Sequence, residues 1–151
     1  MFVYEPETGI IRRRPGRRNK GPGQRAGYRK DGYREVEVRH RLYREHRLIW
    51  LIVTGQWPAE LVDHRNGDGE DNCWTNLREA TQPMNAQNLR NATKANLTSG
   101  LLGVTLHKCG RWQAAISVDG RPRYLGLFAD PNVAHATYLE AKRELHKGCT
   151  L

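Results

Sequence analysis

Long hydrophobic runs are missing from this chain of 151 residues. The longest apolar run, Leu48–Val53, falls well short of the roughly 18 apolar residues that a membrane-spanning helix needs. Hydrophobic residues make up 38% of the sequence, below the share usual in globular proteins, and charged residues make up an ordinary 27%. The composition therefore argues against a membrane protein and predicts a polar, soluble chain of one domain or two small ones.

Cysteine is also scarce. Cys73, Cys109 and Cys149 are odd in number and widely spaced, with no Cys-x-x-Cys pair. This pattern argues against a disulfide framework and against a four-cysteine zinc site, so we expect three reduced thiols. The first residues lack the basic region and the apolar core of a signal peptide, and a cytoplasmic protein is expected.

Acidic residues are too few to balance the basic ones, and the net charge is +9. Such an excess favours nucleic acid or an anionic membrane surface as the partner. Ile10–Lys30 holds nine Lys or Arg residues and no acid, and its Gly and Pro content predicts a loop. That loop is either a solvated basic segment or a clamp on a phosphate backbone. Only 61–98 has more acids than bases, five against four, which suggests a carboxylate kept available for a cation.

The first part of the chain predicts short strands and one helix. Phe2–Arg14 is typical of two extended pieces around a turn. Asp31-Gly32 is a hairpin-turn signal before a half-buried strand at Tyr33–His40. Glu45–Thr54 predicts a largely buried helix, and Gly55 is well placed to end it in a left-handed conformation.

Leu61–Asn88 is the most informative stretch. It predicts a strand ending near Asp63 and His64, a polar loop over Arg65–Thr75, a returning strand over Asn76–Ala80 and a helix that starts after Thr81. Phosphodiester hydrolysis needs a cation near the developing charge and a base that activates water. Carboxylate and amide oxygens suit Mg²⁺, and a histidine suits the base. Neighbours on a regular strand point to opposite faces, so Asp63 and His64 can share a site only if the strand twists or ends there.

A calcium loop, a zinc site and a purely structural turn are other interpretations of this stretch. A calcium loop of the EF-hand kind starting at Asn66 fails, because Asp71 stands at the glycine position and Leu77 at the bidentate acid. A zinc site fails for want of a Cys or His cluster. Composition alone leaves open that Asp63 and Asn76 merely brace a polar turn.

The spacing of this stretch resembles that of the HNH endonucleases. The likeness is greatest to the phage and intron-encoded homing enzymes of the ββα-metal type, in which the last His of the motif is an Asn. It extends upstream through Glu45–Trp50 and Tyr4-x-x-x-Thr8-Gly9, and covers about 1–90. The pattern that carries it is Val62-Asp63-His64-x-x-Gly67-Asp68-x-x-Asp71-Asn72-x-x-x-Asn76-Leu77-Arg78-x-x-Thr81-x-x-x-Asn85-x-x-Asn88.

The resemblance implies a role for each matched position. Asp63 and Asn85 are expected to ligate one divalent ion per active site, Mg²⁺ or Mn²⁺, and His64 to be the general base. Asn76 is expected to brace the loop and the base, and Asn88 to support the site or touch DNA. The implied reaction is attack of water on a scissile phosphate of double-stranded DNA, by a monomer or a dimer. A phage-encoded enzyme would act in the host cytoplasm.

The C-terminal part predicts a second module of three strands and one helix. The strands are expected at Gly103–His107, Arg111–Val118 and Arg123–Phe128, and the helix runs from Pro131 to about His146. Ala134, Tyr138, Ala141 and Leu145 form the helix stripe, and the face of the middle strand that holds Trp112, Ala114, Ile116 and Val118 should lie under it.

This module resembles an AP2 domain through Gly100–Val104, Arg111-Trp112-x-Ala114-x-Ile116, Tyr124-Leu125-Gly126-x-Phe128 and Ala134–Ala141. That family reads the DNA major groove with the outer face of its sheet. Its usual base-contacting arginines are replaced here by Thr105, His107, Ser117 and Pro122, and Tyr124 stands where a DNA-contacting Trp is usual. The target sequence therefore cannot be carried over from the family.

The sequence as a whole predicts an α+β protein with two modules: an HNH endonuclease domain over 1–92 with its core motif at 61–90, a linker over 93–98, and an AP2-like DNA-binding domain over 99–151. The alternative is a non-catalytic DNA-binding regulator in which the HNH fold is only a scaffold. The residues expected to contact DNA are Arg12, Arg13, Arg14, Arg17, Arg18, Arg47, Arg78, Asn88, Thr105, His107, Arg111, Gln113, Ser117, Arg121 and Tyr124.

Overall fold

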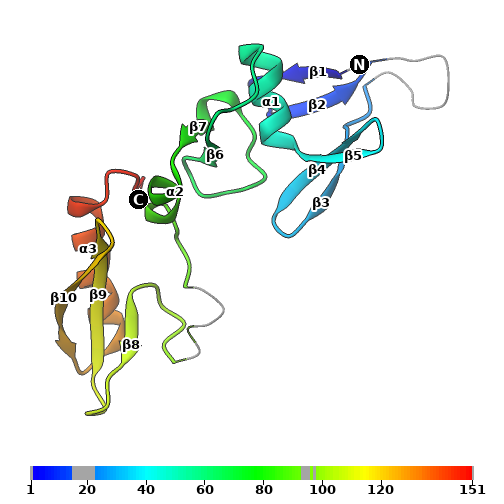
Figure 1. The fold of residues 1–151 in the computed structure, drawn as a ribbon. Coiled ribbons are helices and arrows are strands. Elements are labelled where there is room, and N and C mark those ends of the chain that lie inside the picture. Colours follow the sequence, from blue (N-terminus) through cyan, green and yellow to red (C-terminus); the bar gives the residue numbers. More distant parts are fainter. Residues whose placement is uncertain (1, 15–22, 93–95, 97, 151) are drawn as a thin grey trace. The chain divides into compact units, whose positions relative to one another are not determined.

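The computed structural model describes residues 2–14, 23–92, 96 and 98–150. Figure 1 shows them as small sheets and short helices. The chain folds as two compact units, Met1–Gln82 (unit 1) and Pro83–Leu151 (unit 2). The linker expected at 93–98 lies inside unit 2, with most of its residues outside the described ones, so the domain limits drawn from the sequence stay a prediction. No helix in the described part is long and apolar enough to cross a membrane.

Unit 1 begins with two antiparallel sheets. The expected pair is present as β1 (Phe2–Glu5) and β2 (Ile10–Arg13). The second sheet has the order β3 (Tyr28–Lys30), β4 (Tyr33–Val38) and β5 (Arg41–Arg44). Asp31 and Gly32 join β3 to β4 with φ values of 51° and 76°, which is the hairpin turn that their sequence predicts.

Strands β3 and β5 were not expected. β3 is short and lies where the Gly-rich basic stretch predicts a loop. β5 follows a tight turn made by Arg39 and His40, whose φ values are 49° and 62°. Arg39 does not signal such a turn, because left-handed backbone ordinarily favours Gly, Asn or Asp. The turn is therefore set by strand pairing rather than by local preference.

Helix α1 (Glu45–Thr54) ends as predicted, with Gly55 at φ 75° donating its N–H to the Leu51 carbonyl at 3.0 Å. The prediction that this helix is largely buried was wrong. Leu51 and Ile52 remain 36% and 42% exposed. A helix on a small unit covers the core with only one face, and here that face holds Glu45, His46, Leu48 and Ile49.

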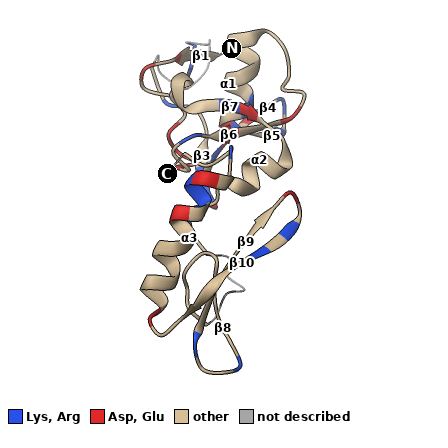
Figure 2. Ribbon diagram, turned by 90° about the vertical axis from the view of Figure 1, so that its left-hand side faces the viewer, with Lys and Arg blue, Asp and Glu red and all other residues tan. Residues whose placement is uncertain are grey.

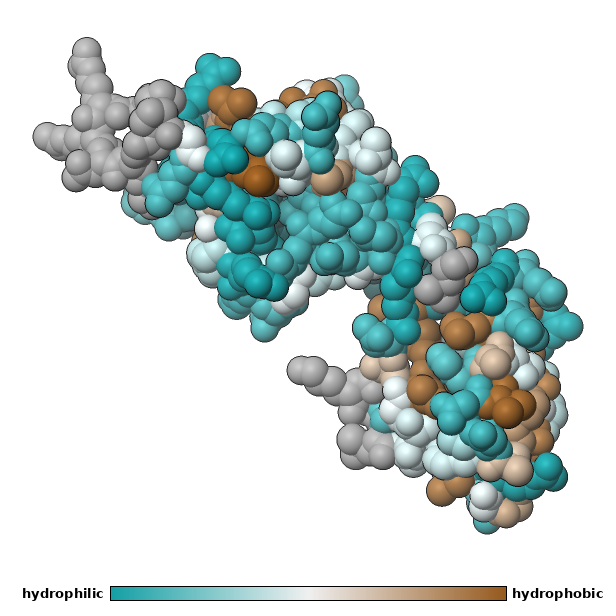
Figure 3. Space-filling model, turned by 180° about the vertical axis from the view of Figure 1, so that it is seen from behind, coloured by the Kyte–Doolittle hydropathy of each residue, from teal (hydrophilic) through white to brown (hydrophobic). Residues whose placement is uncertain are grey.

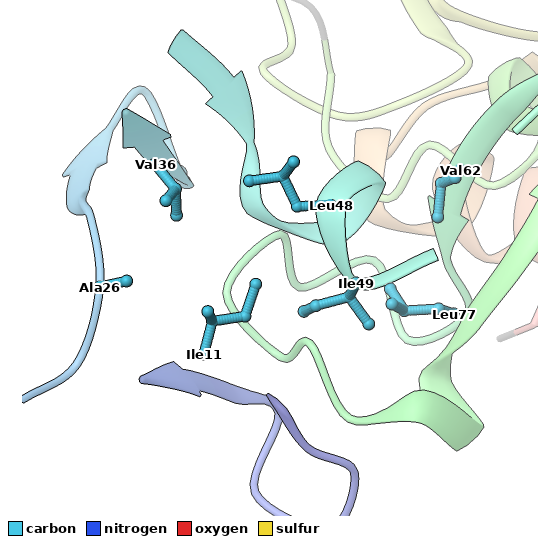
Figure 4. Close-up of a cluster of buried hydrophobic side chains, with 7 residues drawn as sticks. All are labelled: Ile11, Ala26, Val36, Leu48, Ile49, Val62 and Leu77. Carbon is cyan, nitrogen blue, oxygen red and sulfur yellow. The ribbon is translucent and has the colours of Figure 1, made fainter. Parts of the chain in front are cut away.

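The core of unit 1 joins α1 to five of the surrounding segments (Figure 4). Each large aliphatic side chain buried in this way contributes about 1.5–3 kcal/mol. Because the cluster draws on α1 and on both strands of the central stretch, it fixes the helix against them. Its buried members are Ile11, Ala26, Val36, Leu48, Ile49, Val62 and Leu77.

The central stretch folds in the predicted order of strand, loop, strand and helix. β6 (Leu61–His64) pairs antiparallel with β7 (Leu77–Ala80), and a 3-10 turn (Trp74–Asn76) leads into β7. Helix α2 (Gln82–Gln87) follows in the sequence, and its residues from Pro83 onward belong to unit 2.

Unit 2 has the predicted three-stranded antiparallel sheet with one helix packed on it. The strand order is β10 (Arg121–Phe128), β9 (Trp112–Val118) and β8 (Val104–Leu106). Helix α3 (Pro131–Leu145) starts as expected, because the Asp130 side chain accepts a hydrogen bond from the Asn132 N–H at 2.7 Å. The predicted core face of β9 is confirmed, since Ala114 and Ile116 are buried and Ala114 packs with Val104 and Ala134.

The predicted stripe of α3 is correct only in its first half. Ala134 and Tyr138 are buried. The third buried residue of the helix is Lys142, whereas Ala141 and Leu145 are only half-buried. Lys142 is 1% exposed, and its ammonium group donates to the Leu89 carbonyl. A long side chain can bury its aliphatic stem while its charged end finds a polar partner, which a hydrophobic pattern does not reveal.

Candidate active site

Asp63 lies in β6 and is 7% exposed. It pairs across the ladder with Arg78 of β7, whose Nε and Nη2 donate to the carboxylate oxygen Oδ2 at 3.0 and 2.8 Å. The negative charge at the end of β6 is therefore compensated within the sheet. Arg78 was expected to contact DNA, but it is only 8% exposed and its guanidinium is engaged with Asp63. Strand register explains the difference, since it sets Arg78 directly opposite the buried carboxylate.

His64 is held by a residue of the polar loop. It is 4% exposed, and its Nε2 lies 2.9 Å from Oδ1 of Asn72. Asn72 is 1% exposed, and its Nδ2 donates to Oε2 of Glu45, the first residue of α1, at 2.9 Å. A chain of buried polar groups thus runs from the start of α1 through the loop to the histidine ring.

Glu45 is fully buried and faces two arginines. Its Oε2 lies 3.6 Å from Nη2 of Arg25 and 3.4 Å from Nε of Arg34. Burial raises the pKa of Glu45, while the two guanidinium groups and the hydrogen bond from Asn72 act in the opposite direction. Its place in the first turn of α1 also favours a carboxylate there.

Aromatic rings surround His64. The ring of His46 meets it edge to face, with centroids 4.9 Å apart and an interplanar angle of 84°. Tyr33 lies 5.7 Å from the His46 ring and 6.0 Å from the His64 ring, and the Arg44 guanidinium lies over Tyr33 at 4.9 Å. Burial, with a smaller contribution from His64, lowers the pKa of His46 to about 3. His46 is therefore an uncharged packing partner of His64 at neutral pH.

This shift in His46 predicts a pH-dependent stability. Unfolded His46 takes up a proton below pH 6.5, whereas folded His46 does so only near pH 3. The unfolded state then binds more protons. The free energy of unfolding therefore decreases as the pH is lowered from 6.5 to about 3, by at most about 1.4 kcal/mol per pH unit. Urea unfolding at pH 7 and pH 5 measures it, and His46→Gln should show a smaller loss than the parent protein. His40→Gln is the matched control, because the His40 side chain is 99% exposed; equal losses in the two variants would contradict the assignment.

Asn76 is hydrogen-bonded to two residues of the polar loop that it was expected to brace. Its Oδ1 accepts from the Asn66 N–H at 2.9 Å, and its Nδ2 donates to Asn66 Oδ1 at 3.0 Å and to the Asp71 carbonyl at 2.7 Å. These bonds close the loop between β6 and β7. His64, the expected base, has a hydrogen-bond partner in Asn72, a residue for which the sequence suggested no role of its own.

Asn85 and Asn88 belong to unit 2. Asn85 lies on α2, and its pairing with Asp63 at a metal stays a prediction. Asn88 is 5% exposed, and its Oδ1 accepts from the Thr150 hydroxyl at 3.0 Å. This hydrogen bond lies within unit 2, and the expected role of Asn88 in supporting the site or touching DNA stays a prediction.

The expected DNA-contacting arginines of unit 1 differ in their surroundings. Arg12 is paired with Glu5 at 2.7 Å, and Arg13 lies over the Phe2 ring at 5.6 Å. Arg47 lies over the Trp57 ring at 5.2 Å, and Arg14 is exposed. The other two expected contacts, Arg17 and Arg18, lie outside the described residues.

Most of the unit 2 residues that are expected to contact DNA lie on one face of its sheet. Directly paired residues of an antiparallel sheet share a face, and Thr105 pairs with Gln113. Ser117 and Tyr124 lie on the same side by alternation and by the pairing of Tyr124 with Ala115. His107 and Arg111 continue that alternation beyond the strand ends, whereas Arg121 pairs with Val118 on the side of α3. Figure 2 shows basic residues on the β9–β10 hairpin, and Figure 3 shows hydrophobic residues exposed on both units.

The donor set can be compared with what a metal needs. No group of three or more His, Cys, Asp or Glu side chains able to hold an ion is found among the described residues. In unit 1 the expected ligand Asp63 supplies a buried carboxylate, an oxygen donor of the kind that a hard cation such as Mg²⁺ takes. The described residues do not offer the closed set of Cys and His ligands that a structural zinc site takes.

Residues 43–87 match the model of the HNH endonuclease family. The matched segment includes α1, β6, β7 and the loop between them, and so contains Glu45, Asp63, His64, Asn72 and Asn76. The match supports an HNH nuclease module, a type of phosphodiester hydrolase that acts on DNA and generally uses divalent metal ions. No curated protein and no solved structure matches the chain.

Proposed function

We propose that the protein is a metal-dependent DNA endonuclease that hydrolyses phosphodiester bonds. The observation that carries the proposal is the buried pair Asp63 and His64 at the end of β6, inside the segment that matches the HNH family. Each of the two has its own fixed partner, Arg78 for the carboxylate and Asn72 for the imidazole. A mere polar turn does not need a buried imidazole and a buried ion pair on adjacent residues.

In the proposed reaction His64 takes a proton from the attacking water as general base. Asp63 and Asn85 would hold one divalent ion, Mg²⁺ or Mn²⁺, which stabilises the charge that develops on the scissile phosphate. Asn76 keeps the loop between β6 and β7 closed through its bonds to Asn66 and Asp71, so that the base stays in place. The buried ion pair with Arg78 fixes the orientation of the Asp63 carboxylate.

We assign the selection of the DNA target to surfaces outside the site of Asp63 and His64. The outer face of the unit 2 sheet, with Arg111, Gln113 and Tyr124, would bind DNA in the manner of an AP2-like domain. Tyr124 is 59% exposed, and an exposed aromatic ring beside a basic residue suits stacking and phosphate contact. In unit 1, Arg12–Arg14 and Arg47 would add contacts to the backbone that weaken with salt.

The finer identity proposed is an HNH enzyme of the phage or intron homing kind. A non-catalytic DNA-binding regulator on an HNH scaffold is the competing class. It would bind DNA without ever cutting it, whereas the enzyme cuts. The buried Asp63 and His64 favour the enzyme, because a scaffold alone has no need of a base beside a carboxylate.

Metal removal tests the proposal. Supercoiled plasmid should be converted to nicked or linear DNA with Mg²⁺ or Mn²⁺, and EDTA should abolish the conversion, because the phosphate charge then has no counter-ion. Gel electrophoresis of the plasmid measures it, with a matched sample in which excess Mg²⁺ is added back after EDTA. Cutting that persists in EDTA would rule out the metal-dependent reaction, and binding without cutting in any metal would favour the regulator.

A further inference from the structure

His64 and Asn72 can pair in two ways. Either His64 Nε2–H donates to the amide oxygen, or a bare Nε2 accepts from the amide NH₂. The choice matters because a neutral histidine carries one proton, so the arrangement at Nε2 decides which nitrogen has the lone pair. Distance alone does not distinguish the two arrangements.

Glu45 distinguishes them. Its Oε2 lies near Arg25 at 3.6 Å and Arg34 at 3.4 Å, and guanidinium groups only donate. Oε2 is therefore an acceptor, and the Asn72 atom 2.9 Å away must be the NH₂ nitrogen. With its nitrogen directed to Glu45, Asn72 turns its carbonyl oxygen to His64, and a carbonyl oxygen can only accept.

Both the backbone and the side-chain amide of Asn72 are hydrogen-bonded. Besides its two side-chain bonds, its backbone carbonyl accepts from the Tyr4 hydroxyl at 2.8 Å, and its N–H donates to the Glu70 carbonyl at 3.1 Å. Both Asn72 and Glu45 are buried at 1% and 0% exposure. Turning the amide would direct its oxygen at the Glu45 carboxylate and leave two buried acceptors facing each other, which costs the desolvation of both.

We propose that Asn72, fixed by Glu45, is a positioning residue that keeps the proton of His64 on Nε2, so that Nδ1 is the nitrogen that accepts a proton in the reaction. This inference rests on the proposed role of His64 as the base. It assigns the tautomer to Asn72 and Glu45, whereas Asn76 maintains the loop. The same bond fixes the rotation of the ring, which His46 supports from one side.

The tautomer is measured without any reaction, by ¹⁵N NMR of histidine-labelled full-length protein at pH 8 in the absence of metal. His64→Ala identifies the signals of His64. The expected result is a protonated Nε2 and an unprotonated Nδ1 in the parent protein, and a smaller share of this tautomer in Asn72→Leu. A protonated Nδ1 in the parent protein would overturn the inference, and this measurement needs no variant at position 72 to fold.

Kinetics provide the second readout. Asn72→Leu should lower kcat roughly 10–100-fold, as loss of a group that orients a reacting histidine does, and leave KM within about twofold. Glu45→Gln should shift the tautomer and kcat in the same direction, whereas Glu79→Gln, a matched change at an exposed carboxylate that caps Ala59 and Glu60, should do neither. An unchanged tautomer and kcat in Asn72→Leu would overturn the inference. Full activity in His64→Ala would instead overturn the proposed base while leaving the tautomer result valid.

Discussion

Replacing His64 with alanine is expected to lower the rate of plasmid nicking by roughly 10²–10⁴-fold, the usual effect of removing a general base. His64 is 4% exposed, follows the buried Asp63 in the chain and is held by Asn72, so the variant loses the group that is positioned to act as the base. Initial rates at saturating Mg²⁺ on supercoiled DNA measure the change. Binding of DNA should change little, because the loss falls on the chemical step.

The matched control is His40→Ala, since the side chain of His40 is 99% exposed. It should cut at the parental rate. Circular dichroism must show that both variants are folded. A His64→Ala protein as active as its His40→Ala counterpart would refute the assignment of the base.

Breaking the buried pair of Asp63 and Arg78 is expected to have the largest effect on stability. Arg78→Met should cost about 3–5 kcal/mol, because it leaves the Asp63 carboxylate buried without its compensating charge. Urea unfolding followed by tryptophan fluorescence measures it. Trp50 and Trp74 pack against the unit 1 core, so they report the unit in which the pair lies.

Two comparisons make this prediction specific. The double variant Asp63→Asn with Arg78→Met should lose much less than the single one, because no net charge is left buried. Arg12→Met removes one member of the exposed pair with Glu5, whose side chains are 35% and 41% exposed, and should cost at most about 1 kcal/mol. A loss in Arg78→Met no greater than in Arg12→Met would contradict the buried pair.

The order of elements in the central stretch could be predicted from the sequence because its signals are local. The apolar pair Leu61-Val62 ends at Asp63, a new strand begins at Leu77, and the Gly, Asn and Asp content between them favours a loop. Asn76 was expected to brace this loop, and its hydrogen bonds to Asn66 and Asp71 lie within it. The helix cap at Gly55 and the turn at Asp31-Gly32 follow from the backbone freedom of glycine.

The partners of the candidate base could not be predicted, because they come from distant parts of the chain. Asn72 and Glu45 are 27 residues apart, and Arg25 and Arg34 precede both. A carboxylate at the first turn of a helix is usually a solvated dipole partner, so its burial depends on what packs over it. One signal was available for Asn72, since it stands among the matched positions of the loop pattern, but no local rule assigns it to His64.

The segment that matches the HNH family begins at residue 43, yet the groups that hold its polar network begin at residue 4. Tyr4 bonds to Asn72, Pro6 accepts from the Trp74 N–H at 3.1 Å, and a Cβ at Gly9 would meet the Asn72 backbone at 2.4 Å. A fragment of residues 43–87 would keep Asp63, His64 and Asn76. It would lose the β1–β2 hairpin, which contacts the loop between β6 and β7. A fragment that is to fold on its own therefore needs the strands β1 and β2 in addition to residues 43–87.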